Sequence, residues 1–461
     1  MTIDGAAVPG AGTFEVINPA DESVVAQAPL CSPAQLDDAI VSARMAQPAW
    51  AALTYDERGR LIVAAADAVQ ARAQELGRLL SAEQGKPLQD AINEIGGFGY
   101  WLRESAALRL PETVNEDSEV RHSVTRRVPL GVAGVIVPWN YPVGNAGFKL
   151  APALLAGNTA VWKPSPYTPL TTLTVGQILR QVLPPGVLNV LSGDDALGPR
   201  MSAHPGLDMI SFTGSTRTGR QVMAAAAASL TRVTLELGGN DPAIVLPDVD
   251  VEQAAEKLFW GAFANSGQVC LAIKRLYIHR RVYEPLKRAL SDYCAGVKIG
   301  NGAEPGVQLG PVQNRPQYER VLALIREVEP FVIGGQRGDG PGFFIPPTLI
   351  DNPPESSRIV QEEQFGPVLP LLVFDDTEQA IARANAGEYG LGASVWSADP
   401  GAALAIARRL QAGTMWVNEV QRLTPHVTFA GHKQSGIGSE SGLEGLLEYT
   451  LPQTITVKAG G

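Results

Sequence analysis

The sequence predicts an α/β protein whose first large unit is a doubly wound, parallel sheet. From Arg121 onward, short apolar runs bounded by Gly or Pro alternate with helical stretches, the order typical of such sheets. A second strand-and-helix series follows from Ala243 to about Asn418. The chain has 461 residues, enough for about three folding units. Apolar residues make up 45% and charged residues 18%, a composition that excludes a disordered or fibrous protein.

Each series contains five predicted strands. The first has strands at Val132–Val137, Thr159–Trp162, Gly186–Leu191, Met209–Phe212 and Arg232–Leu237, with helices over 145–156, 169–182, 195–203 and 217–230. The second has strands at Ile244–Leu246, Arg275–His279, Thr348–Ile350, Leu369–Phe374 and Ala393–Trp396. The polar, Pro/Gly-rich stretch from Gly300 to Pro316 is predicted to be a surface connection.

The two ends of the chain add a hairpin, helices and one late strand. Residues 14–29 contain two β-rich runs around turn-forming residues and predict a hairpin. Apolar residues spaced by three and four predict helices over Ser32–Ala51, with Ser32 as N-cap, and over Tyr55–Glu83. The alternating run Thr454–Lys458 is a strand that could pair with Ser123–Val128.

Charge and leader patterns exclude several classes of partner. Lys and Arg total 37 against 47 Asp and Glu, a net charge of −10 that repels nucleic acid backbones. The N-terminus has neither a basic nor an apolar leader segment, so we expect a cytoplasmic protein. The longest uncharged run, Val128–Phe148, contains three prolines and four glycines, which argue against a membrane span. Three cysteines without a CxxC or Cys/His cluster predict neither disulfides nor a metal site.

Three side chains could carry covalent chemistry, and each also has a structural interpretation. Cys270 precedes a predicted strand; it is either a nucleophile or a small core residue. Glu236, 34 residues earlier, lies at the end of an apolar strand, either as a stored base or in a structural ion pair. Asn140 stands between Pro138 and Pro142, either as a rigid donor to an oxyanion or as part of a plain turn.

Two other segments could bind a ligand at the carboxyl ends of strands. The run from Phe212 to Gly219 joins a strand to a helix, and its free N–H groups suit a pyrophosphate. It is not a P-loop, because Arg220 and Gln221 replace the required Lys-Ser/Thr pair, so a nucleotide-hydrolysing P-loop protein is excluded. Lys163 ends a predicted parallel strand, where it either points into the ligand crevice or is a surface lysine.

Taken together, these segments resemble the aldehyde dehydrogenase superfamily over nearly the whole chain. Seven motifs carry the resemblance in the order of the family: Pro138-Trp-Asn-Tyr141, Trp162-Lys-Pro-Ser165, Phe212-Thr-Gly-Ser-Thr216, Leu235-Glu-Leu-Gly-Gly239, Gly267-Gln-Val-Cys270, Glu362-Glu-Gln-Phe-Gly-Pro367 and Gly431-His-Lys-Gln-Ser-Gly436. The resemblance implies a Rossmann-like cofactor domain (1–120 and 129–236), an α/β catalytic domain (237–430) and a β-strand oligomerisation bridge (121–128 and 447–461).

The resemblance also implies a role for each site residue. Cys270 would be the nucleophile and Glu236 the general base, Asn140 and the Cys270 N–H would form the oxyanion hole, and Glu440 would relay protons. The implied cofactor-binding residues are Trp139, Lys163, Ser165, Pro166, Gly214, Ser215, Thr216, Gly219, Glu363 and Phe365. The implied cofactor is NAD. Many NAD-preferring relatives keep a Glu where this chain has Pro166, so the resemblance leaves NADP as a second cofactor.

The expected reaction is oxidation of an aldehyde to the carboxylic acid by a homodimer or homotetramer. The residues expected to line the aldehyde tunnel are apolar or aromatic and predict a hydrophobic substrate, aromatic or medium-chain aliphatic: Tyr100, Trp101, Tyr141, Val269, Leu271 and Phe429. One alternative is a CoA-acylating enzyme, which generally lacks the base. Another is a non-catalytic structural protein that kept the fold, which predicts loss of Asn140, Glu236 or Cys270.

Overall fold

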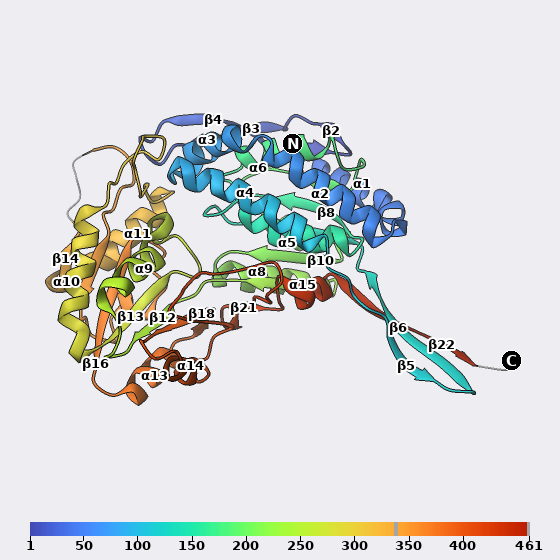
Figure 1. The fold of residues 1–461 in the computed structure, drawn as a ribbon. Helices are drawn as coiled ribbons and strands as arrows, with labels where there is room; N and C mark the ends of the chain where they lie inside the picture. The colour runs from blue at the N-terminus through green and yellow to red at the C-terminus, as the bar shows by residue number, and fades with distance from the viewer. Residues whose placement is uncertain (336–339, 459–461) are drawn as a thin grey trace.

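The computed structural model describes residues 1–335 and 340–458. Two large, mainly parallel sheets form the body, and a small antiparallel sheet projects from it as an arm (Figure 1). The predicted α/β class is therefore confirmed. The last three residues of the predicted bridge segment 447–461 lie outside the described residues.

The first sheet has eight strands in the order β2-β1-β9-β8-β7-β10-β11-β21. Its five central strands are parallel, and the strand order reverses between β7 and β10, a switch point where such sheets bind ligands. All five predicted strands are present. The bounds are β1 (Thr2–Ile3), β2 (Ala6–Ala7), β7 (Val132–Ile136), β8 (Thr159–Lys163), β9 (Leu188–Val190), β10 (Met209–Thr213), β11 (Arg232–Glu236) and β21 (Gly436–Ile437).

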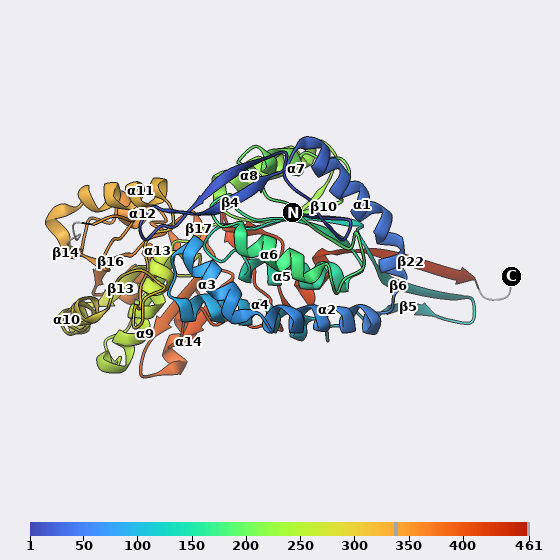
Figure 2. The same ribbon diagram turned by 90° about the horizontal axis from the view of Figure 1, so that it is seen from above.

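Helices cover both faces of this sheet, as Figure 2 shows. On one face lie α1 (Pro33–Ala52), α7 (Leu197–Ser202) and α8 (Thr216–Ala227). On the other lie α5 (Gly144–Leu155) and α6 (Leu170–Leu179), backed by α2 (Tyr55–Gln70), α3 (Ala73–Gln84) and α4 (Leu88–Ser105). The sheet is thereby buried on both sides, which explains its near-continuous apolar strands.

One helix prediction needs correction, one helix was not predicted, and one cap prediction is confirmed. The predicted helix Tyr55–Glu83 is two helices, because Arg72 leaves helical geometry at φ −112° and ψ 17°. No Gly or Pro marks this break, so the apolar spacing runs through it. Helix α4 was not among the predicted elements. Ser32 caps α1 as predicted, accepting a hydrogen bond from the Gln35 N–H at 3.2 Å.

The second sheet has seven strands in the order β14-β15-β16-β13-β12-β18-β19, and only β14 runs antiparallel to its neighbour. Its bounds are β12 (Asp241–Val245), β13 (Ile273–His279), β14 (Val332–Gly334), β15 (Thr348–Asp351), β16 (Val368–Phe374), β18 (Gly392–Trp396) and β19 (Thr414–Val417). Its helices are α9 (Val251–Phe263), α10 (Arg280–Gly296), α11 (Arg315–Arg326), α12 (Arg358–Gln361), α13 (Thr377–Asn385) and α14 (Pro400–Ala407).

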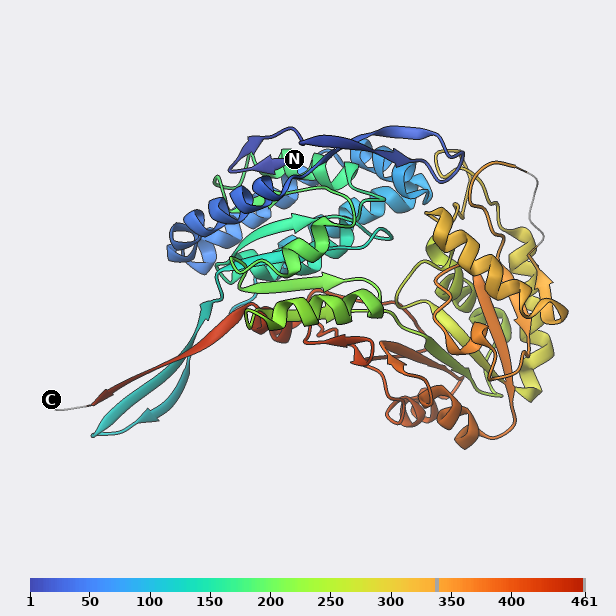
Figure 3. The same ribbon diagram turned by 180° about the vertical axis from the view of Figure 1, so that it is seen from behind.

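The arm consists of β5 (Thr113–Asp117), β6 (Arg121–Pro129) and β22 (Thr450–Lys458) (Figure 3). The predicted pairing between the late strand and residues 123–128 is confirmed, with Thr454 opposite Thr125. Strand β5 is an addition to the prediction. The remaining elements are the predicted hairpin β3 (Gly12–Ile17) and β4 (Val24–Leu30), the pair β17 (Tyr389–Gly390) and β20 (His432–Lys433), helix α15 (Gly442–Glu448), and the short 3-10 helices η1 (Ala264–Gly267) and η2 (Glu329–Phe331).

The uncharged run Val128–Phe148 is divided between the end of β6, strand β7 and the start of helix α5. Among the described residues, no helix is both long enough and apolar enough to span a membrane.

Candidate active site

Cys270 lies in a turn between the short 3-10 helix η1 (Ala264–Gly267) and strand β13. The backbone before it is left-handed at three successive residues, with φ of 50° at Asn265, 56° at Ser266 and 72° at Gly267. A Cβ at Gly267 would lie 2.1 Å from the Gly366 carbonyl oxygen, so this position requires glycine. Backbone strain of this kind persists only where the surroundings hold it, and it concentrates at functional sites.

Buried hydrogen bonds hold this turn. The Gln268 amide donates to the Asn265 carbonyl at 2.8 Å and accepts from the Gln313 N–H at 2.8 Å. The Ser266 hydroxyl donates to the Gly310 carbonyl at 2.7 Å. Residues 309–314 are therefore buried, and the prediction that 300–316 is a surface connection is wrong for this part. The polar composition of the segment hid its role as a support for the Cys270 turn.

The Cys270 thiol is surrounded by apolar side chains and by buried charges. Burial raises the pKa of Cys270 to about 12; Lys274 lowers this pKa, whereas Asp241, Glu363 and Glu236 raise it through their charges. The thiol is therefore almost entirely un-ionised at neutral pH. The apolar neighbours include four of the predicted tunnel residues, Tyr141, Val269, Leu271 and Phe429.

The other two predicted tunnel residues are placed differently. Trp101 is buried against the Phe148 ring at 4.3 Å between centroids, and its indole N–H donates to the Ser441 hydroxyl at 3.2 Å. Tyr100 is 41% exposed. Neither residue belongs to the apolar cluster around Cys270. The two rings pack edge to face at 5.6 Å between centroids, with Trp101 on the buried side and Tyr100 on the exposed side.

Glu236 and Glu440 meet as a buried pair of carboxylates. Glu236 ends β11, and its Oε2 has no hydrogen-bond partner among the described residues. Burial raises the pKa of Glu236 well above the ordinary range, and the Glu440 charge raises it further. The Lys149 ammonium bonds to Glu440, donates to the Ser211 hydroxyl at 3.2 Å and opposes this rise. Glu236 is therefore linked electrostatically to a buried hydrogen-bonded cluster of Glu440, Lys149 and Ser211.

Lys149 was missed at the level of sequence, although a signal was present. It is the only charged residue of helix α5, whose other residues are apolar or small apart from Asn145. A lysine on such a helix requires a buried partner, because an isolated buried charge is strongly unfavourable. That partner is Glu440.

Asn140 follows β7 in a turn whose backbone is hydrogen-bonded to a second buried ion pair, Lys86 and Glu94. Lys86 and Glu94 are each 1% exposed and lie 2.6 Å apart. The Lys86 ammonium donates to the Asn140 carbonyl at 2.9 Å, and Glu94 accepts the N–H groups of Val143 and Gly144 at 3.0 Å each. The Asn140 side-chain amide donates to the Gln268 carbonyl at 2.8 Å, and among the described residues its second hydrogen has no acceptor. Lys86 and Glu94 were not singled out by the sequence.

The turn after β10 has the form expected for binding a diphosphate. Gly214 and Gly219 allow close packing, since a Cβ at Gly219 would lie 2.5 Å from Leu237 Cδ2. Ser215 caps α8 by accepting the Thr218 N–H at 3.2 Å. Among the described residues, the N–H of Thr216 has no protein acceptor, as helix geometry requires for the first turn. A free N–H at the start of a helix fits a phosphate of a dinucleotide.

Lys163, Ser165 and Pro166 lie together where β8 ends. Lys163 is 5% exposed, and burial lowers its pKa to about 8, although Asp195 and Asp194 raise it through their charges. The two aspartates follow β9, the neighbouring parallel strand, and are exposed. Two adjacent acids directly after a parallel strand were a signal that the sequence interpretation did not use.

The segment Glu363–Phe365 reaches two turns of the first sheet through separate contacts. The Trp139 and Phe365 rings pack edge to face at 5.3 Å between centroids, and Phe365 has a positive φ of 52°. Glu363 accepts the Gly239 N–H at 3.1 Å, and its carboxylate lies 3.5 Å from the Lys274 ammonium. The structure thus places the motif Glu362–Pro367 next to the turns that follow β7 and β11.

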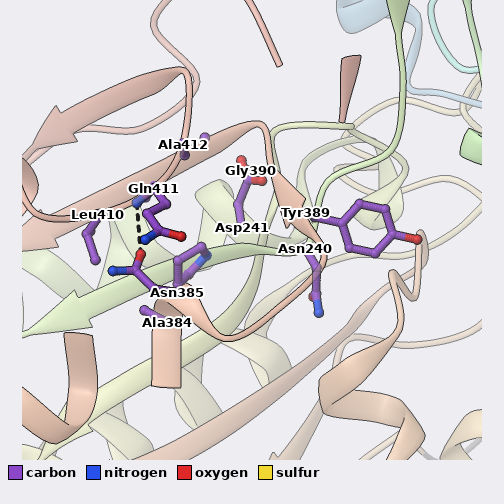
Figure 4. A pocket seen from close by; sticks show the side chains of 12 residues that line it. Asn240, Asp241, Ala384, Asn385, Tyr389, Gly390, Leu410, Gln411 and Ala412 are labelled. Carbon is purple, nitrogen blue, oxygen red and sulfur yellow. Dashed lines mark hydrogen bonds between the residues drawn. The ribbon is translucent and has the colours of Figure 1, made fainter. Parts of the chain in front are cut away.

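A small pocket lies beside the Cys270 turn and is drawn in Figure 4, where the Gln411 N–H donates to the Asn385 side chain. Asp241 lines it, and neither carboxylate oxygen of Asp241 has a side-chain hydrogen-bond partner among the described residues. Burial raises the pKa of Asp241 to about 7. The pocket is lined by Asn240, Asp241, Pro242, Ala384, Asn385, Tyr389, Gly390, Gly392, Ala393, Leu410, Gln411 and Ala412.

Comparison with known proteins decides the family. The sequence model of the Aldehyde dehydrogenase family matches residues 7–455. The chain belongs to the aldehyde dehydrogenase family. It is 41% identical to a Pseudomonas protein named "Probable aldehyde dehydrogenase", over 99% of this chain and 94% of that protein. It is 39% identical to betaine aldehyde dehydrogenase 1 of Rhizobium meliloti (strain 1021), over 99% and 97%.

A solved structure shows the same fold. The betaine aldehyde dehydrogenase of Staphylococcus aureus, in complex with NAD⁺, superposes with a TM-score of 0.96 at 33% identity, covering 100% of this chain and 94% of that one. The predicted family, the aldehyde dehydrogenase fold and the enzyme class are therefore confirmed.

Proposed function

We propose that this aldehyde dehydrogenase oxidises an aldehyde to the carboxylic acid through a thioester on Cys270, with NAD as the preferred cofactor and NADP as a second one. The observation that carries the proposal is a thiol and a carboxylate in one buried region. Glu236 Oε2 has no hydrogen-bond partner among the described residues, and the Glu236 charge raises the pKa of the Cys270 thiol. A nucleophile and a base in one buried site are what acyl chemistry with water requires.

The first step is addition of the Cys270 thiolate to the aldehyde carbon. The oxyanion that forms is stabilised by hydrogen bonds from the Cys270 N–H and the Asn140 side-chain amide. Because the pKa of Cys270 is raised to about 12, the thiolate is a minor species at neutral pH and the step accelerates with pH. The oxyanion then collapses to the thioester as the carbon–hydrogen bond breaks, and a nicotinamide dinucleotide, when bound, would supply the acceptor for the hydride that leaves.

The second step is hydrolysis of the thioester. Glu236 takes a proton from a water molecule, and the resulting hydroxide adds to the thioester carbon. The carbon–sulfur bond then breaks, which releases the carboxylic acid and regenerates Cys270. The Glu440–Lys149 pair accepts the proton from Glu236 and carries it away from the reacting atoms.

The residues at the ends of β8 and β10 would hold the cofactor. The turn of Gly214, Ser215, Thr216 and Gly219 would bind the pyrophosphate, and Lys163, Ser165 and Pro166 would surround the adenosine ribose. Trp139, Phe365 and Glu363 would contact the nicotinamide half. Asp194 and Asp195 support a preference for NAD, since their charges repel the extra phosphate of NADP.

The apolar cluster around Cys270 supports a hydrophobic aldehyde, aromatic or medium-chain aliphatic. We propose a cytoplasmic homodimer or homotetramer in which the arm bridges subunits. Its domains would be the cofactor domain (1–120 and 129–236), the catalytic domain (237–430) and the arm strands (121–128 and 447–461).

The test is formation of NADH and NADPH from a panel of aldehydes, each assayed with and without CoA. We expect turnover without CoA, faster with NAD than with NADP, and higher kcat/KM for aromatic and medium-chain aldehydes than for short ones. Cys270→Ala is expected to remove turnover and leave cofactor binding within a few fold, and Cys31→Ala is the matched control. Turnover that requires CoA would replace the proposal with the acylating reaction.

A further inference from the structure

Lys274 is a buried cation directed at the Cys270 turn. It lies on β13, four residues after Cys270, and is 2% exposed. Its ammonium donates to the Val269 carbonyl at 2.9 Å and to the Cys270 carbonyl at 2.7 Å. The third neighbour is the Glu363 carboxylate at 3.5 Å. The ammonium therefore donates two hydrogen bonds to carbonyls of the turn, and the Glu363 carboxylate balances its charge.

The bond to Val269 bears on the Cys270 N–H, because the two groups belong to one peptide unit. The structure has no cis peptide bond among the described residues, so the Val269 C=O and the Cys270 N–H point in opposite directions. A cation on the carbonyl fixes the plane of the peptide and polarises it, which makes the N–H a stronger donor.

The Cys270 N–H itself is available. Within the described ranges it donates to no backbone or side-chain acceptor of the protein. The Val269 carbonyl, in contrast, accepts twice, from Lys274 and from the Ala272 N–H at 3.1 Å. The peptide is thus held through its carbonyl while its N–H stays free for a ligand.

We propose that Lys274 is a positioning residue that orients and polarises the Val269–Cys270 peptide, so that the Cys270 N–H can stabilise the oxyanion formed at Cys270. This inference rests on the proposed function, because it assumes that Cys270 is the nucleophile. It assigns Lys274 a role separate from ionisation of the thiol.

The two roles need separate measurements, since the Lys274 charge also lowers the pKa of Cys270. Acylation of Cys270 by p-nitrophenyl acetate passes through a tetrahedral oxyanion, and release of nitrophenolate reports it without any cofactor. Alkylation by iodoacetamide uses the same thiolate and forms no oxyanion at a carbonyl. Peptide mass spectrometry distinguishes Cys270 from Cys294 in the alkylation.

We expect Lys274→Met to slow acylation about tenfold more than it slows alkylation, a smaller factor than the roughly 100-fold or greater loss for a deleted oxyanion donor. Lys274→Arg, which keeps the cation, is expected to restore part of the acylation rate. Lys298→Met is the matched control, because Lys298 also donates to a backbone carbonyl, that of Pro305 at 2.9 Å. It should change neither rate.

Equal losses in acylation and alkylation would overturn the proposal, since Lys274 would then act on the thiol alone. Lys274→Gln, which keeps a neutral donor, provides the same comparison if the methionine variant does not fold. Failure of the proposed function is recognised separately. In that case the wild-type enzyme forms no NADH from any aldehyde, or Cys270→Ala retains turnover.

Discussion

At the scale of single residues, substitution of Glu236 tests its proposed role as the base. Glu236→Gln keeps the shape of the side chain and cannot accept a proton from water. It also removes a charge that raises the pKa of Cys270. We expect a rapid burst of NADH followed by slow steady-state turnover, measured by stopped-flow absorbance. Loss of the burst would show that Glu236 acts before hydride transfer. Glu252→Gln, in the first turn of helix α9, is the control.

The pH dependence follows from the same two residues. The pKa of Cys270 is raised to about 12, so the burst rate should increase with pH throughout the range from 6 to 10. The pKa of Glu236 is also raised, and its basic form is lost as the pH falls, so hydrolysis should weaken at a higher pH than for an ordinary carboxylate. A burst rate that is level between pH 6 and 8 would contradict the first expectation.

Cofactor choice depends on another single position. Pro166 leaves the end of β8 without a carboxylate, and Pro166→Glu should reduce turnover with NADP more than turnover with NAD. One partly screened charge pair is worth about 1–2 kcal/mol, or about fivefold to thirtyfold in the ratio of kcat/KM values. Pro166→Gln is the uncharged control. Equal effects on both cofactors would show that residue 166 does not face the 2′ position.

At the scale of elements, Lys86, between α3 and α4, and Glu94, on α4, form the buried pair that holds the Asn140 turn. Lys86→Met should destabilise the protein by about 3–5 kcal/mol, because it leaves Glu94 charged and unpaired. The double variant Lys86→Met/Glu94→Gln should recover much of this stability, as measured by denaturant unfolding. We expect kcat to stay low in the double variant, because the Asn140 carbonyl has lost its Lys86 donor. Recovery of both properties would show that the pair only stabilises the fold.

At the scale of the whole molecule, the arm presents an exposed apolar row on one face. Val114, Val124 and Ile455 are neighbours across β5, β6 and β22, with Val114 59% and Ile455 48% exposed. An apolar row on a projecting sheet is typical of a subunit contact. Ile455→Lys should shift the protein toward smaller species in light scattering coupled to gel filtration. Thr456→Lys, on the opposite face of β22, should leave the assembly unchanged.

The sequence alone predicted the strands better than the helix ends and the connecting segments. Short apolar runs between turns predicted the strands well, because parallel strands buried on both faces leave that pattern in the chain. The helix predictions were weaker where no Gly or Pro marked an end, as between α2 and α3. The segment 309–314 was misjudged because its backbone groups bond inward: the Gln313 N–H donates to the Gln268 side chain, and the Gly310 carbonyl accepts from the Ser266 hydroxyl.

The sequence by itself determined the family, the α/β class and the identity of the candidate residues, since short motifs hold Cys270, Glu236 and Asn140 at fixed positions in the chain. Only the tertiary structure revealed which buried charges surround them. Lys86, Lys149 and Lys274 are 8 to 291 residues from the acids they meet: Glu94, Glu440 and Glu363. Such pairs leave little local pattern, because the low dielectric of the interior matters only after distant segments have packed together.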